Sequence, residues 1–332
     1  MNKRCLLGLV LISLMFPWAG CKKAGEAAKP APLPTGAAEL KLQWPKGRRV
    51  VESYSMAMSG TINLPGQAPQ KQDVEMRLKF QNSAVKDTAT GGRLVEMEFL
   101  GSALSLAMNG QKLVDFDSAK NGPGDNKNGS WKAMIGRKLQ YYLDASNRVE
   151  NVEGIKELRS SLSADGTQAA SAANQMLDSI YSRETFKQLL DNGTYLPGKP
   201  VAPGDSWPVE VNTTSGQLGE VTDELTFTLG GWEVHDGHNC AHLTFDGTMA
   251  THPDSQTDKS KMKASINSSK LTGDTWFDLD RGLFLEGAAH VDLDMKIVMP
   301  NPAAALSPKQ PKELNLTYTT HIEQGTKVES VD

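Results

Sequence analysis

Side chains that could bind a metal are concentrated in one short stretch of the chain. They are Glu233, His235, His238, Cys240 and His242. The Asp236-Gly237 pair in their midst favours a two-residue hairpin turn, which would place His235 opposite His238. Alternation along each strand would then put all five side chains on one face of the hairpin. Imidazole and thiolate groups suit zinc or copper, so the three histidines and the cysteine are candidate metal ligands.

The spacing of these residues matches no standard metal-binding pattern, and a polar hairpin with a single thiol is the alternative interpretation. A second acidic stretch, Asp278-x-Asp280-x-Gly282, resembles part of a calcium loop. It lacks the length and the final glutamate of such a loop, which favours a plain turn. Four carboxylates lie on predicted strands, and two of them on adjacent strands could form an acid–base pair; the alternative is that all four face solvent. They are Glu96, Glu98, Asp115 and Asp117.

The motifs of the common enzyme classes are missing from the sequence. It has no Gly-x-Ser-x-Gly elbow, no His-Glu-x-x-His, no Cys-x-x-Cys, no phosphate loop and no dinucleotide-binding glycine pattern. No nucleophile has an identifiable base. We therefore expect a protein that is not an enzyme and that has no cofactor.

Alternation of apolar and polar residues predicts the strands that carry these side chains. In residues 74–81 every second residue is apolar and the residues between are charged or polar, which indicates a strand with one buried face. Asn109-Gly110 predicts a hairpin because both residues tolerate positive φ. Apolar residues three and four positions apart between 155 and 190 instead predict helices, each with an apolar stripe that needs a partner surface.

The order of these elements predicts a mainly β fold with two curved antiparallel meander halves, either half-barrel or sandwich-like. The N-terminal β half covers 41–152, a helical segment packed on the sheet covers 153–196, and the C-terminal β half covers 197–332. Similar turn motifs occur in the same order in the two halves, which suggests an internal duplication, although unrelated antiparallel hairpins also share such motifs. A second meander and the helices would cover the edges and the apolar face that one meander leaves exposed.

An apolar ligand held between helices and sheet would meet several methionines, whose flexible side chains adapt to irregular shapes. The candidate lining residues are Met56, Met58, Met97, Met108 and Met176. Ordinary core packing is the alternative role for these side chains.

The first residues predict export. Asn2-Lys3-Arg4 is basic, 5–16 is apolar, and Ala19-Gly20 precedes Cys21. This order is typical of a secretory signal peptide, here 1–20. The residues before Cys21 also resemble a bacterial lipobox, with Trp18 where an aliphatic residue is usual. The resemblance implies that Cys21 is acylated and that 21–40 is a flexible tether; an ordinary signal peptide is the alternative.

The composition limits which partners and which disulfides the protein can have. The chain has 332 residues and a formal net charge of −4, which argues against a nucleic-acid partner because such proteins present basic surfaces. Cys5 would leave with the signal peptide and Cys21 would carry lipid. Cys240 would then remain alone, without an intramolecular disulfide.

Several turn and strand-start motifs resemble a group of bacterial lipoproteins that is known only as a domain of unknown function. The motifs are Trp44-Pro45-x-Gly47, 92–99, Phe116-Asp117-Ser118, 149–154 and 203–208. They extend over nearly the whole mature chain. They consist of turn and strand-start residues, so the resemblance assigns no catalytic residue to this protein. The turn at 276–283 also resembles turns in half-barrel lipoprotein carriers, which hold acyl chains between a curved sheet and helices.

Together these observations predict a non-catalytic lipoprotein anchored in the bacterial envelope through its N-terminal lipid. It would face the periplasm, with the outer membrane favoured over the inner membrane, and would bind an apolar or lipid ligand or serve as a structural module. Two alternatives remain: a scaffold lipoprotein that binds other proteins, and a metal-binding or hydrolytic protein that uses the 233–242 hairpin. The protein partners are not identifiable from the sequence.

Overall fold

The protein is described here from a computed structural model. The structure describes residues 32–120, 134–162, 186–187, 190–215, 219–252, 263–301, 304 and 310–332. The predicted signal peptide, Cys21 and most of the predicted tether lie outside these residues. In the described part of the chain, no helix has the length and apolarity that crossing a bilayer requires.

The described chain is built almost entirely from strands. They are β1 (Arg49–Asn63), β2 (Gln70–Asp87), β3 (Arg93–Met108), β4 (Gln111–Asp117), β5 (Lys138–Leu143), β6 (Val149–Glu153), β7 (Ser206–Ser215), β8 (Gly219–His235), β9 (His238–His252), β10 (Lys263–Asp278), β11 (Leu283–Pro300) and β12 (Glu313–Val331). The helical elements with described bounds are α2 (Ile155–Leu162) and the short 3-10 helix η2 (Asn192–Tyr195). Phe186, Lys187 and Leu190 are also helical. The prediction of a mainly β fold is confirmed.

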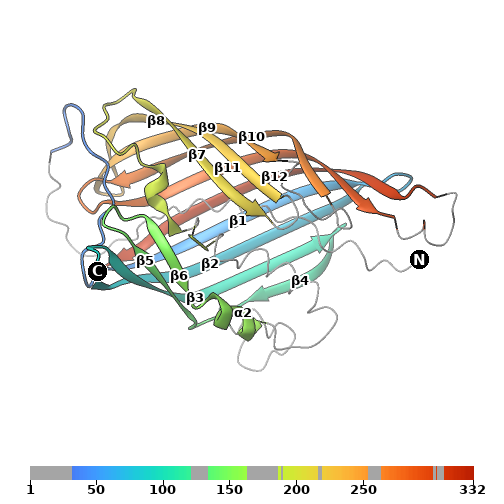
Figure 1. Ribbon diagram of the computed structural model, residues 1–332, viewed down its shortest axis with the longest axis horizontal. Helices are drawn as coiled ribbons and strands as arrows, with labels where there is room; N and C mark the ends of the chain where they lie inside the picture. Colours follow the sequence, from blue (N-terminus) through green and yellow to red (C-terminus); the bar gives the residue numbers. More distant parts are fainter. Residues whose placement is uncertain are drawn as a thin grey trace.

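All twelve strands belong to one antiparallel sheet with the order β6-β5-β3-β2-β1-β12-β11-β10-β9-β8-β7, and β4 pairs with β3 beside this path. Except for β4 with β5 and β6 with β7, strands that follow each other in sequence are neighbours. The two ends of the fold meet where β1 pairs with β12. Figure 1 shows the sheet curled, with β1 and β12 side by side in its middle. The sheet is open between β6 and β7.

The two predicted β halves correspond to β1–β6 and β7–β12, and the β1–β12 pair makes them one continuous sheet. The duplication itself stays a prediction. Of the predicted helical segment, α2 is present and buries Leu158 in the main core. Phe186 meets Phe99 of β3 edge to face, with 6.5 Å between the ring centres. The helical pattern at 169–180 lies outside the described residues.

Alternation along the strands separates an apolar inner face from a polar outer face. In β2 the side chains of Val74, Met76, Leu78 and Phe80 are buried, and the residues between them are exposed or half-buried. The same pattern recurs through the long strands, so the inner face forms one large hydrophobic core. Burying each Leu, Ile, Phe or Met contributes about 1.5–3 kcal/mol, which makes this face the main source of stability.

The segment before β1 ties together parts of the sheet that are distant in the sequence. Ala38 forms a β-bridge with Val201, and the backbone N–H of Gln43 donates to the Gly282 carbonyl at 2.9 Å. The side-chain amide of Asn147 donates to the Leu42 carbonyl at 2.9 Å. Residues 36–40, the end of the predicted tether, thus lie against the folded body.

Candidate functional site

The predicted hairpin between β8 and β9 is present. Asp236 and Gly237 have φ values of 50° and 84°, as a two-residue turn with two positive φ angles requires. His235 pairs with His238, and Glu233 pairs with Cys240. Because directly paired residues share a face, the register predicted from the sequence is confirmed.

Two of the predicted ligands pack against a tryptophan of β10. The rings of His235 and His242 both stack on Trp276, with ring centres 4.1 Å and 4.7 Å away and interplanar angles of 12° and 4°. The Trp276 indole N–H donates to the Glu233 carboxylate at 2.5 Å. These side chains form an aromatic stack over the outer face of the sheet.

The other two predicted ligands lie elsewhere. His238 has its Nε2 2.9 Å from the Arg281 guanidinium and its Nδ1 3.4 Å from the Asp278 carboxylate. Burial and the adjacent Arg281 charge lower the pKa of His238. Cys240 is fully buried in a small second core, separate from the main one. The other buried members of this core are Val50, Leu283, Leu285 and Val328.

His235 instead belongs to a group with Asp236 and Glu286, whose potential ligand atoms lie within 4.8 Å of one another. A lysine already occupies this group, since Lys327 Nζ donates to Glu286 at 2.8 Å and to Asp236 at 3.2 Å. The described residues contain two groups with ligand atoms this close, and neither group contains His238, Cys240 or His242. The four predicted ligands therefore do not gather around one point.

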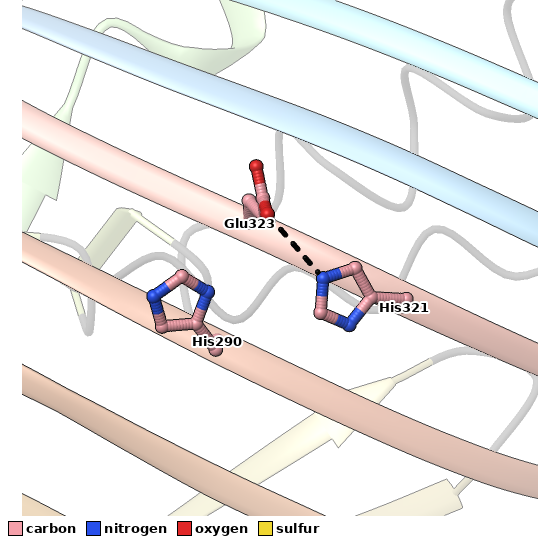
Figure 2. A group of neighbouring side chains, drawn as sticks. All are labelled: His290, His321 and Glu323. Atoms are coloured by element: carbon pink, nitrogen blue, oxygen red, sulfur yellow. Dashed lines mark hydrogen bonds and ion pairs between the residues drawn. The ribbon is translucent and has the colours of Figure 1, made fainter.

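The second close group was not predicted from the sequence. It consists of His290 on β11 with His321 and Glu323 on β12, and Figure 2 shows the three side chains together on neighbouring strands. His321 Nδ1 lies 2.8 Å from Asp292 Oδ1, and its Nε2 lies 3.5 Å from Glu323 Oε1. The hydrogen bond with Asp292 is the main cause that raises the pKa of His321.

A shallow trough of about 710 Å³ crosses the outer face beside this group. Its walls come from β1, β2, β10, β11 and β12, and they include Thr61, Lys71, Lys270, Asp292, Asp294 and His321. The two His-x-acid pairs, 290–292 and 321–323, are the sequence signal for this region. In each pair one apolar residue separates two polar ones, so both polar side chains face outward.

The remaining acidic candidates have ordinary partners. The Asp278 carboxylate is buried and accepts the backbone N–H groups of Asp280 and Arg281, both at 2.9 Å. Gly282 closes this turn with φ 63°. These bonds describe a capped turn, the interpretation favoured from the sequence.

The strand carboxylates form ion pairs on the outer face. Lys138 Nζ lies 2.7 Å from Glu96 and 3.5 Å from Glu98. Asp115 pairs with Lys112 at 2.8 Å, and Asp117 pairs with Arg77 at 3.4 Å. All four carboxylates thus face a cation, and none of these contacts brings two of them together as an acid–base pair.

The candidate methionines occupy the inner face. Met56, Met58 and Met97 are buried in the main core, and Met108 packs partly buried at its margin. Met176 lies outside the described residues. These positions agree with both roles considered from the sequence, core packing and the lining of an apolar site.

Polar groups interrupt this apolar face at a few points. Burial raises the pKa of Glu52 on β1 to about 7, against a hydrogen bond from Asn82 that lowers it. Burial also raises the pKa of Asp223 on β8 to about 7. The Tyr54 hydroxyl is buried without a hydrogen-bond partner in the described structure. Unpaired buried donors are uncommon in proteins, because each costs free energy.

The model of a protein family of unknown function, DUF6263, matches residues 92–284. This match confirms the resemblance to a family of unknown function, and the lipoprotein part of that resemblance stays a prediction. Curated proteins gave no match. Among solved structures, lipovitellin has a TM-score of 0.44 at 10% identity; the alignment covers 87% of this chain but only 26% of the lipovitellin chain.

Two further solved structures are more distant. DynF from the dynemicin biosynthesis pathway of Micromonospora chersina has a TM-score of 0.18 at 6% identity, with 93% and 95% of the two chains covered. OpdQ of Pseudomonas aeruginosa has a TM-score of 0.17 at 7% identity, with 84% and 99% covered. No functional inference rests on likenesses this distant.

Proposed function

Because this chain belongs to a family of unknown function, DUF6263, which assigns it no activity, we propose a role from the molecule itself. The protein is a non-catalytic lipoprotein of the bacterial envelope. It holds an apolar ligand, such as an acyl chain, against the inner face of its curled sheet. The observation that carries this proposal is the continuous apolar inner face of an open sheet of twelve strands.

The size of the sheet supports an occupant. In a closed sheet of about eight strands the side chains just fill the interior or leave room for one small ligand, and more strands enclose a wider space. Here twelve strands curl around one apolar face, and β6 and β7 are not hydrogen-bonded to each other. In this proposal the ligand would enter between these two edges, which a closed sheet lacks.

The chemistry of the lining supports an apolar ligand with a polar end. Met56, Met58 and Met97 supply flexible, polarisable surface. Near them on β1, the unpartnered Tyr54 hydroxyl and the Glu52 carboxyl could hydrogen-bond a ligand headgroup. A few polar groups in an apolar lining are typical of small-molecule sites.

Anchoring rests on the sequence before the described residues. Cleavage before Cys21 and acylation of its thiol would attach the chain to a bilayer, facing the periplasm, with the outer membrane favoured. Labelling of cells with a palmitate analogue tests this directly. The labelled protein should be recovered with membranes, and Cys21→Ser should lose both the label and the membrane association.

One observation favours a second candidate, a structural or scaffolding lipoprotein without a ligand. Many inner-face side chains, including Phe99 and Met97, are already almost fully buried by the chain itself. If side chains fill the interior completely, no space is left for a ligand. The binding experiment below separates these two candidates.

The experiment uses full-length protein purified from membranes in mild detergent and then depleted of lipid. A dansyl-labelled undecanoic acid serves as the probe, with fluorescence and native mass spectrometry as readouts. We expect saturable binding with a defined number of probe molecules per chain. Met56→Trp, which fills the inner face, should weaken binding at least tenfold.

Ala57→Trp is the matched control, because the adjacent residue of the same strand is exposed on the outer face. It should bind the probe like the unmodified protein. Non-saturable binding, or equal binding by both variants, would reject the ligand proposal in favour of the structural module. Circular dichroism of each variant confirms that the sheet is intact.

A further inference from the structure

Four side chains form a compact square on the outer face of β11 and β12. His290 pairs directly with Glu323, and Asp292 pairs directly with His321. Each strand thus contributes one histidine and one carboxylate, and each histidine lies opposite a carboxylate. Directly paired residues of an antiparallel sheet have Cβ atoms about 4.5–5.5 Å apart, so the four groups are held close together by the backbone itself.

The contacts of His321 resemble those of a metal-binding histidine before the metal arrives. Its Nδ1 lies 2.8 Å from Asp292 Oδ1, and because an ionised carboxylate can only accept, Nδ1 carries the proton. The lone pair of the neutral ring is then on Nε2, which faces Glu323 (Figure 2). Histidines that bind metals usually donate their second N–H to a carboxylate in this way.

The separation between His321 and Glu323 also fits a metal. The Nε2 to Oε1 distance is 3.5 Å, which is long for a hydrogen bond. Two ligand atoms of a tetrahedral zinc ion, each about 2.0–2.2 Å from it, lie roughly 3.4 Å apart. The His290 ring is the third group, with its centre 6.4 Å from that of His321 and the two rings 17° from parallel. One ligand atom from each residue lies within 4.8 Å of the others.

We propose that His290, His321 and Glu323 bind one divalent transition-metal ion of the zinc or copper class, and that Asp292 orients His321 for this role. Two imidazoles and one carboxylate are suitable ligands for these ions. Three protein ligands leave a fourth position, on the side exposed to solvent beside the polar trough. The proposal does not depend on the ligand that we assign to the inner face.

The other close group on the outer face provides an internal contrast. His235, Asp236 and Glu286 have a similar composition, yet Lys327 is hydrogen-bonded to both of their carboxylates. That ammonium group offsets part of their negative charge and occupies the space between them. Among the described residues, the ion-pair partner of Asp292 and of Glu323 is His321 alone. Lys270 of β10 pairs directly with Asp292, but it forms no ion pair with the carboxylate of Asp292 or of Glu323 in the described structure.

The backbone under the site is well supported. Val291 and Ile322 pair with each other across the two strands and are buried in the main core on the opposite face. These apolar contacts fix the strands, so metal binding needs only rotations of exposed side chains. Variants at the exposed positions should therefore retain the fold.

Calorimetric titration of full-length, chelator-treated protein in detergent tests the proposal, with zinc chloride as the probe. We expect one ion per chain, with His290→Ala and His321→Ala each weakening binding at least tenfold. Asp292→Asn should weaken zinc binding roughly tenfold to a hundredfold, with an unchanged unfolding temperature in the absence of metal. Cobalt should give the visible absorption of a low-coordinate site.

His235→Ala is the matched control and should leave zinc binding unchanged. The proposal is wrong if His290→Ala and His321→Ala bind zinc like the unmodified protein, or if His235→Ala is the variant that loses binding. His321→Asn, which retains a polar side chain of similar size, replaces the alanine variant if that variant does not fold. Binding of magnesium with the same affinity would also contradict a transition-metal site.

Discussion

Asn82 donates a hydrogen bond from Nδ2 to the Glu52 carboxylate at 2.6 Å, within the pair formed by β1 and β2. Protein surrounds the Glu52 carboxyl, although its side chain keeps part of its accessible surface. Burial disfavours the charged form and raises the pKa to about 7, against the opposing hydrogen bond from Asn82. Burial raises the pKa of Tyr141, and the negative charge of Glu52 raises it further.

The raised pKa makes stability depend on pH. The unfolded chain holds the Glu52 proton only below about 4.5, whereas the folded chain holds it up to about 7. The folded state therefore binds more protons between these values, and the free energy of unfolding falls as pH rises through this window. Glu52→Gln should raise the free energy of unfolding by about 1–3 kcal/mol at pH 8 and change it little at pH 4.

Urea denaturation of both proteins at the two pH values measures this difference. Glu75→Gln is the control, because Glu75 is exposed on the outer face of β2. It should alter stability by less than about 0.5 kcal/mol at either pH. A Glu52→Gln effect of equal size at pH 4 and pH 8 would show that the carboxyl does not titrate as described.

Gly247 of β9 has no room for a side chain. A Cβ atom at this position would lie 2.1 Å from the Glu224 carbonyl oxygen and 2.9 Å from the Leu225 Cα. These are backbone atoms of the paired strand β8, so they cannot move aside like the tip of a flexible side chain. Gly247→Ala should lower the free energy of unfolding by about 2–3 kcal/mol or more, measured by urea denaturation.

Gly231 of β8 is the matched control for this change, because a Cβ atom there would meet nothing within 4 Å. Gly231→Ala should be nearly neutral in the same measurement. Similar losses in both variants would mean that the general flexibility of glycine, rather than the close approach of the two strands, is what matters.

Local pattern predicted much of this fold. Alternation in 74–81 gave the buried face of β2, and Asn109-Gly110 gave the turn between β3 and β4, with φ values of 51° and 78°. The Asp236-Gly237 turn gave the register of the β8–β9 hairpin. A tight turn fixes the register of its strands, so these features can be read from a few neighbouring residues.

Long-range pairing could not be predicted in this way. The connection between β11 and β12 is long, so the facing of His290 and Glu323 depends on the whole sheet rather than on a turn. Two irregularities, at Leu229/Gly231 in β8 and Trp276/Phe277 in β10, also shift the strand registers. Such shifts change which side chains meet, and the proximity of Asp236 to Lys327 of β12 could not be anticipated.

Trp276 packs against the small second core in which Cys240 is buried. Trp276 is partly buried against this core and is stacked by His235 and His242. Trp276→Ala should remove this packing, with a loss of about 3 kcal/mol in the free energy of unfolding. Cys240 should then react with N-ethylmaleimide in the folded protein at least tenfold faster than in the unmodified chain.

Peptide mass spectrometry after a timed reaction follows Cys240 separately from the other cysteines. Trp232→Ala is the control, because Trp232 packs against the main core rather than against the second one. It should leave the reaction rate of Cys240 unchanged. Equal protection of Cys240 in Trp276→Ala would show that the strand backbone, not the indole ring, shields the thiol.

Arg148 and Asp191 connect the region of β6 to the segment that leads to β7. Arg148 Nε donates to Asp191 Oδ1 at 2.8 Å, and its Nη2 donates to Asp191 Oδ2 at 2.9 Å. Asp191 is mostly buried, so Arg148→Met would leave its charge without this partner. We expect a loss of about 2–3 kcal/mol and faster hydrogen exchange in β6 and η2, with β1 and β12 unchanged.

The surface pair of Arg77 with Asp117 is the matched control for this prediction. Its atoms are 3.4 Å apart and the Arg77 side chain is 68% exposed, so Arg77→Met should cost less than about 1 kcal/mol. Exchange in β6 should remain slow in this variant. If Arg148→Met instead accelerates exchange equally in β1, β6 and β12, the ion pair stabilises the sheet as a whole. If only β6 and η2 respond, Arg148 and Asp191 stabilise mainly the region of β6 and the segment that leads to β7.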